Sequence, residues 1–149
     1  MTMKTMRRLG ALALLVVGGV HLQQYFAGYS IVPTIGALFV LNAISAAVVS
    51  VGLLAPLERL LSDRRADLAA GLLSMLGAMI AVGALIALFI SESQPLFGFM
   101  EYGYSTPIVI AIAAEAITAI LLVPVAVAAL RRAASGDSGP RFSRALGSH

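Results

Sequence analysis

The chain has 149 residues, of which 60% are apolar and only 11% are charged, whereas a soluble domain carries about 25% charged residues. The composition therefore excludes a cytosolic enzyme, a disordered protein and a nucleic-acid-binding protein. The net charge of +3 comes from basic residues scattered at the ends of apolar blocks, which form no basic patch for nucleic acid. Because there is no cysteine, disulfide and thiolate chemistry are excluded as well. We expect an all-α integral membrane domain surrounded by the lipid bilayer.

Four apolar blocks predict membrane spans, each long enough to cross about 30 Å of hydrocarbon. They cover about residues 9–27, 33–57, 66–90 and 106–130. The first block follows three basic residues as a signal peptide would, but its length and the lack of an Ala-x-Ala site favour a span. We therefore expect a four-helix membrane domain over residues 1–132 and a flexible, Ser-, Gly- and Arg-rich cytoplasmic tail over residues 133–149.

The distribution of basic residues predicts the orientation of the spans. All ten Lys and Arg lie before the first span, between the second and third, or after the fourth. The other two loops carry only Glu92 and Glu101, so the positive-inside rule places both termini in the cytoplasm. Aromatic residues gather at the opposite, outer ends of the spans, as interfacial aromatics do. The preference for Arg over Lys and the many Ala residues are typical of a GC-rich bacterial genome, so we expect the bacterial cytoplasmic (inner) membrane.

Two short patterns occur twice in the same order and predict an internal duplication. Gly28-Tyr29-Ser30 with Pro33 precedes the second span, and Gly103-Tyr104-Ser105 with Pro107 precedes the fourth. Residues 42–46 (Asn-Ala-Ile-Ser-Ala) then correspond to residues 115–119 (Glu-Ala-Ile-Thr-Ala). We interpret the chain as two parallel helical hairpins, related by a pseudo-twofold axis along the membrane normal.

The hairpins are expected to form a left-handed four-helix bundle with small residues at its seams. The candidate seam residues are Gly71, Ser74 and Ala78 on the third span, and Ala111, Glu115, Thr118 and Ala119 on the fourth. Between the second and third spans, Glu58-Arg59 and residues 63–67 predict a solvated, charged cytoplasmic turn.

His21, Asn42 and Glu115 are the polar residues that matter within the spans, since an ionisable group there costs a few kcal/mol and suggests a function. Asn42 and Glu115 lie roughly 12–13 Å past the prolines of their spans, and His21 lies at a similar depth. One interpretation is structural, with Glu115 hydrogen-bonded to Asn42 across a helix seam. The other is a polar pocket for a ligand or a proton that opens outward. Candidates for its mouth are Gln24, Tyr25, Tyr29 and Tyr104.

Specific chemistries find little support in this set of residues. One His and one Glu are too few for a zinc site, and a bis-His haem would need a dimer. No serine has the base and orienting group of a nucleophile, so we expect no catalytic residues, and no motif points to a cofactor. Two function classes stay open: a non-catalytic accessory subunit or lipid/small-ligand-binding module, and a small proton-coupled transporter that uses Glu115. A quinone-handling redox subunit is a weaker alternative, and a membrane-protein partner or a homodimer fits each of them.

Residues 28–46 and 103–119 resemble small four-span membrane proteins of actinobacteria, and the likeness extends over most of residues 15–125. It rests on His21, the aromatic cluster, Pro33-Thr34-Ile35-Gly36, Asn42-Ala43 and Glu115-Ala116. The resemblance implies a fold but no activity. The architecture is also similar to DoxX-type and small multidrug-transporter proteins. The latter have their essential Glu in the first span, where this chain has His21 instead.

Overall fold

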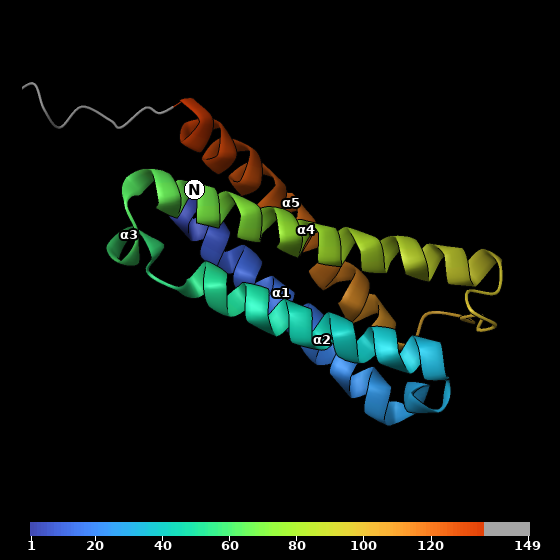
Figure 1. Cartoon of the computed structure of the whole chain (residues 1–149). Helices are drawn as coiled ribbons and strands as arrows, with labels where there is room; N and C mark the ends of the chain where they lie inside the picture. The colour runs from blue at the N-terminus through green and yellow to red at the C-terminus, as the bar shows by residue number, and fades with distance from the viewer. Residues whose placement is uncertain (136–149) are drawn as a thin grey trace, which may run out of the picture.

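The computed structural model describes residues 1–135, and all its regular elements longer than a single bridge are helices. Its long helices are α1 (Met3–Ala27), α2 (Pro33–Leu54), α4 (Asp63–Ser93) and α5 (Thr106–Ser135), joined by the short helices η1 (Tyr29–Ile31) and α3 (Leu57–Leu60) (Figure 1). Each of these four long helices is apolar and long enough to cross a membrane. The prediction of four spans in an all-helical chain is therefore confirmed, as expected of a multi-pass membrane protein.

All four long helices extend beyond or stop short of the predicted spans. α1 begins at Met3, where the Thr2 side chain caps it by accepting a hydrogen bond from the Thr5 N–H. α2 ends at Leu54 because Ala55, the residue before Pro56, is extended. α4 continues three residues past the predicted span at each end, since hydropathy marks the membrane boundary and not the end of backbone hydrogen bonding. α5 runs to Ser135, and residues 136–149 of the predicted tail lie outside the described residues.

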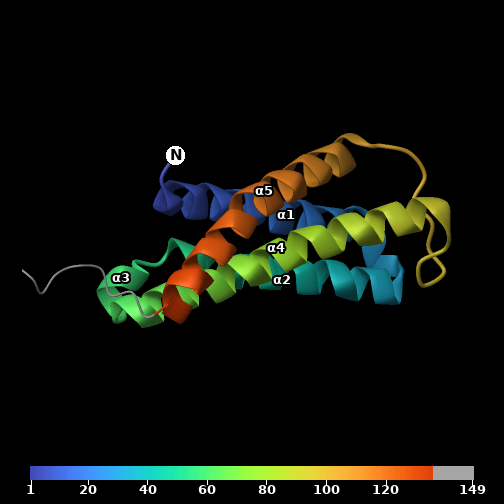
Figure 2. The same ribbon diagram turned by 90° about the horizontal axis from the view of Figure 1, so that it is seen from above.

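The long helices alternate in direction around a four-helix bundle. α1 packs against α2 and α5, α4 packs against α5, and α2 makes a smaller contact with α4 (Figures 1 and 2). Among the described residues, α2 and α5 make no close backbone approach, so they lie diagonally opposite each other. We call the end that holds residues 28–32 and 94–105 the aromatic end, and the end that holds α3 the basic end. The two hairpins run in the same direction, and the duplication itself stays a prediction.

Small residues let the helices approach closely, as predicted for the seams. Gly71, Ser74 and Ala78 are buried, and so are Glu115 and Thr118, whereas Ala111 and Ala119 are half-buried. A tight layer is formed at Gly77, where an added Cβ would lie 2.7 Å from Leu122, 3.1 Å from Leu14 and 3.5 Å from Val49. This layer, contributed by all four long helices, closes the centre of the bundle.

Charged side chains hold the basic end together. Residues of the turn that was predicted to be solvated make these contacts. Arg7 is only 6% exposed and places its Nη2 3.3 Å from Glu58 Oε1 on α3. Arg132 on α5 pairs with Asp67 on α4 at 3.1 Å. Arg7 is therefore a structural residue that docks α3 on α1, in addition to its expected part in orienting the first span.

Candidate functional site

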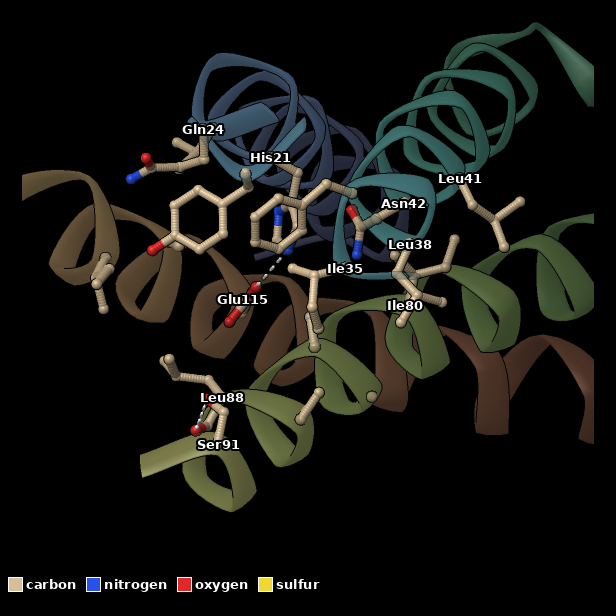
Figure 3. A pocket seen from close by; sticks show the side chains of 18 of the residues that line it. His21, Gln24, Ile35, Leu38, Leu41, Asn42, Ile80, Leu88, Ser91 and Glu115 are labelled. Carbon is tan, nitrogen blue, oxygen red and sulfur yellow. Dashed lines mark hydrogen bonds and ion pairs between the residues drawn. The ribbon is translucent and has the colours of Figure 1, made fainter. Parts of the chain in front are cut away.

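A cavity of about 390 Å³ lies in the half of the bundle next to the aromatic end, with lining residues from all four long helices (Figure 3). Pockets for small molecules typically measure about 300–1,000 Å³. Five residues singled out in the sequence line it, namely His21, Gln24, Tyr29, Asn42 and Glu115. Tyr25 and Tyr104, predicted at its mouth, are not among the lining residues: the half-buried Tyr25 lies beside Gly36 of α2, and Tyr104 is exposed. Tyr104 instead donates a hydrogen bond to Glu92.

His21 on α1 and Glu115 on α5 face each other at one wall of the cavity (Figure 3). His21 Nε2 lies 3.8 Å from Glu115 Oε1, and Glu115 is only 2% exposed. The helices bring them together because each belongs to the buried stripe of its helix, with Gly18 three residues before His21 and Thr118 three residues after Glu115. The polar pair therefore sits inside the bundle between two directly packed helices.

The hydrogen bond at the other ring nitrogen determines the orientation of the imidazole. His21 Nδ1 lies 2.9 Å from the carbonyl oxygen of Val17, one helical turn earlier. Since a carbonyl can only accept, Nδ1 carries a proton, and Nε2 is the atom that faces Glu115. The ring also packs edge-on against Phe39 of α2, with ring centroids 5.1 Å apart. His21 thus presents one defined nitrogen to the carboxyl group.

Asn42 lines the same cavity from α2 but is not hydrogen-bonded to Glu115. Asn42 Oδ1 and Glu115 Oε2 are both buried and have no hydrogen-bond partner among the described residues. One interpretation of the sequence predicted a hydrogen bond between Asn42 and Glu115. This bond does not form, because α2 and α5 lie on a diagonal of the bundle. His21, on the helix between them, is the neighbour of Glu115 instead. Two buried oxygens are thereby left with free hydrogen-bonding capacity at the cavity.

Residues 94–105 cover the cavity at the aromatic end. Phe97 and Gly98 both have positive φ, 52° and 80°, in a tight turn that pairs Leu96 with Phe99. Leu96 and Phe99 both line the cavity, as does Glu101, whose carboxylate accepts a hydrogen bond from the Tyr29 hydroxyl. We call this segment the cover. It ties the second hairpin to the first directly above the cavity.

Aromatic rings connect the cover to His21. The Phe99 ring centroid lies 5.3 Å from that of Tyr29, Tyr29 lies 4.8 Å from Phe39, and Phe39 contacts His21. Burial raises the pKa of Tyr29, and its hydrogen bond with Glu101 and the charge of that carboxylate raise it further. Tyr29 is therefore a neutral hydrogen-bond donor at neutral pH.

Sequence reasoning missed Phe39 and Glu101 as site residues. Phe39 looks like any apolar residue of a span, and Glu101 was noted only as one of two acids in its loop. The available signal is an acid between aromatic residues in a loop, with Tyr29 in the other loop at the same end. Which tyrosine it would contact depends on how the hairpins pack.

The chemistry available in the cavity is hydrogen bonding and proton exchange. Within residues 1–135, no group of three His, Asp or Glu side chains could hold a metal ion.

Comparison with known protein families, curated proteins and solved structures finds no match for this chain. The resemblance seen in the sequence thus assigns no family, and the site is argued from its geometry alone.

Proposed function

We propose that this chain is a non-catalytic ligand-binding module of the bacterial cytoplasmic membrane, with its aromatic end outside. Its cavity would hold a molecule with a polar head, bound by His21, Asn42 and Glu115. The observation that carries this proposal is Glu115 Oε2, a nearly inaccessible carboxyl oxygen at the cavity without a hydrogen-bond partner.

The free-energy cost of leaving buried polar atoms without hydrogen-bond partners favours a bound molecule in the cavity. A buried polar group left without a partner costs about 1–3 kcal/mol, and more when it is charged. Both Asn42 Oδ1 and Glu115 Oε2 are in this state at one cavity. A molecule that donates hydrogen bonds to both atoms would recover that free energy, and much of its surface would be buried by the apolar walls. We infer that the cavity is used for binding.

Proton-coupled transport by Glu115 is the second candidate, favoured by an ionisable pair within apolar helices. The closed layer at Gly77 supports binding over transport, because Leu14 and Leu122 are fully buried directly between the pair and the basic end. Quinone handling is a weaker candidate that rests on His21 and Tyr29.

We further infer that the two hairpins derive from one ancestral hairpin. We also infer that the chain acts as an accessory to a second copy or to another membrane protein.

Mass spectrometry of co-purified molecules tests the proposed function. The wild-type protein and a Glu115→Leu variant are purified from native membranes in mild detergent, and their bound small molecules are extracted. Thr118→Val is the matched control, because Thr118 is buried one turn away and its hydroxyl donates to the Ala114 carbonyl at 2.7 Å. Asn42→Leu replaces Glu115→Leu if that variant does not fold.

We expect one class of molecule to be retained by the wild type and by Thr118→Val, and reduced at least about tenfold in Glu115→Leu, as loss of about 1.4 kcal/mol implies. The same set of bound molecules in all three proteins would refute the proposed function.

A further inference from the structure

The cavity reaches the surface of the bundle on one side, between α2 and α4. Leu41 on α2 and Met79 on α4 both line the cavity, yet each is 60% exposed. Gly83, one turn beyond Met79, also lines it, and an added Cβ there would meet nothing within 4 Å. Nearer the basic end the two helices touch, since a Cβ on Gly52 would lie 3.0 Å from Leu73. Figure 1 shows α2 and α4 spreading apart toward the aromatic end. We call this opening the side opening.

The side opening lies at a depth where lipid chains, and not water, surround a membrane protein. Leu41 is eight residues from the start of α2, roughly 12 Å at 1.5 Å per residue, and Gly83 is ten residues from the end of α4, roughly 15 Å. Both distances fall well inside helices that are apolar enough to span a membrane. A molecule that enters there must be dissolved in the bilayer, so it needs a long apolar part.

Side chains lie over both ends of the cavity. At the aromatic end the cover lies over it, held by the hydrogen bond from Tyr29 to Glu101. At the other end the layer of Leu14, Val49 and Leu122 closes around Gly77. The exposed lining residues, Leu38, Leu41, Met79 and Gly83, all belong to α2 or α4, so the side opening is the part of the cavity that faces the surroundings.

The polar groups favour an uncharged head that donates hydrogen bonds. His21 Nε2 and Glu115 Oε1 lie 3.8 Å apart, and the pair is net neutral when one proton besides that on Nδ1 is held by either the imidazole or the carboxyl group. An imidazolium with a carboxylate and an imidazole with a carboxylic acid both carry no net charge. A pair without net charge costs the least free energy to bury. Glu115 Oε2 and Asn42 Oδ1 then remain as acceptors. A charged head would enter without a countercharge, whereas hydroxyl groups would satisfy both oxygens.

We propose that the cavity takes up an uncharged, hydroxyl-headed lipid from within the bilayer, through the opening between α2 and α4. The hydroxyls would lie against Glu115 and Asn42, and the apolar chain would leave past Leu41 and Met79. This inference rests on the proposed function, because it specifies the ligand and the route for the same cavity.

Fluorescence quenching in detergent micelles tests the route and the class of lipid. The chain contains no Trp, so Met79→Trp adds a single fluorophore at the side opening. The probe is a monoacylglycerol whose chain carries two bromine atoms, which quench Trp on contact. Trp at Ile117, an exposed position on α5 outside the cavity, reports unspecific quenching. A brominated alkyl sulfonate of equal chain length tests a charged head, and glycerol tests the head alone.

A blocking variant tests entry from the side. Gly83→Leu fills the side opening, and Gly19→Leu is its matched control, because Gly19 is an exposed helical glycine on α1 that also has open space around it. Thermal unfolding checks that both variants are folded. We expect saturable quenching by the monoacylglycerol in the Met79→Trp protein and with Gly19→Leu added, and at least about tenfold weaker binding with Gly83→Leu. We expect glycerol and the sulfonate to compete poorly.

Several outcomes would overturn this inference. Equal binding with Gly83→Leu would refute the route, and equal binding of the sulfonate would refute the uncharged head. If the monoacylglycerol does not bind while the purified wild type retains some other molecule in a Glu115-dependent way, the lipid class is wrong and the proposed function stands. If retention does not depend on Glu115 either, the proposed function itself fails.

Discussion

At the scale of single residues, the contact between His21 and Glu115 decides how the cavity is built. The imidazole is oriented by the Val17 carbonyl and by Phe39, and its free nitrogen points at the carboxyl group. Asn42 shares the cavity without joining this pair. A polar side chain can therefore lie at the right depth in a span and still lack the partner that its sequence position suggests.

Double-mutant cycles measure the energetic coupling of Glu115 with His21 and with Asn42. Glu115→Leu should destabilise the protein by about 1–3 kcal/mol, because it removes the polar neighbour of the buried His21 imidazole. We expect the His21→Leu and Glu115→Leu effects to differ from additivity by more than about 0.5 kcal/mol, since the two side chains are in contact. Asn42→Leu combined with Glu115→Leu should be additive within that margin. Thermal unfolding in detergent measures both couplings, and additivity of His21 with Glu115 would contradict the observed pair.

The hydroxyl of Tyr29 gives the stability of the cover a pH dependence. Because its pKa is raised in the folded protein, mainly by burial and then by Glu101, folding favours the neutral phenol. This contribution is fully present below the ordinary tyrosine pKa of about 10 and is lost as pH rises above it. We expect Tyr29→Phe to be less stable than wild type by about 1 kcal/mol at neutral pH, with the difference shrinking in alkaline buffer. Unfolding temperatures of both proteins over that pH range measure this, and a constant difference would show that the hydroxyl does not titrate with folding.

At the scale of helices, the pairing depends on where small residues let two backbones meet. α1 carries two consecutive glycines in different surroundings. A Cβ on Gly18 would lie 2.9 Å from the Ala46 Cβ and 3.2 Å from the Ala43 oxygen, whereas a Cβ on Gly19 would meet nothing within 4 Å. The same residue type thus serves packing at one position and faces outward at the next.

Alanine at each of these glycines tests the α1–α2 seam. Both substitutions raise helix propensity by up to about 1 kcal/mol, but Gly18→Ala must also push α1 and α2 apart. We expect a net loss of about 1–3 kcal/mol for Gly18→Ala, as in overpacked cores, and no loss for Gly19→Ala. Thermal unfolding and helicity of the two purified variants give the comparison. Equal stability of both would mean that the seam is loosely packed.

At the scale of the whole molecule, the basic and aromatic ends are chemically distinct, and this difference predicts an orientation in the membrane. The charged contacts of Arg7 with Glu58 and of Arg132 with Asp67 lie at one end. The cover and its aromatic rings lie at the other, directly over the cavity. The proposed ligand would therefore come from the outer leaflet if the basic end is cytoplasmic.

Cysteine labelling tests this orientation, since the chain has no cysteine of its own. Ser93 at the aromatic end and Ser62 at the basic end are both exposed, so each can be replaced by cysteine without disturbing the core. We expect an impermeant thiol reagent added to intact cells to label Ser93→Cys and not Ser62→Cys. Labelling of both after membrane disruption is the control, and the reverse pattern in intact cells would place the cavity on the cytoplasmic side.

The sequence alone determined the number of spans, their approximate bounds and the seam residues Gly71, Ser74 and Ala78, because hydropathy and small-residue spacing act along one helix. It also singled out His21, Asn42 and Glu115, which line one cavity, since polar groups are rare and costly within apolar helices. These properties are local, so a single sequence carries them.

Only the tertiary structure decided which of these residues meet. The predicted hydrogen bond between Asn42 and Glu115 required α2 and α5 to touch, but the bundle places them on a diagonal and sets His21 beside Glu115. Of the residues predicted at the mouth of the pocket, Gln24 and Tyr29 line the cavity, whereas its exposed lining residues Leu41 and Met79 lie on α2 and α4. Which helices are neighbours, and where two of them spread apart, depends on packing among all four helices at once. No periodicity within one span carries that information.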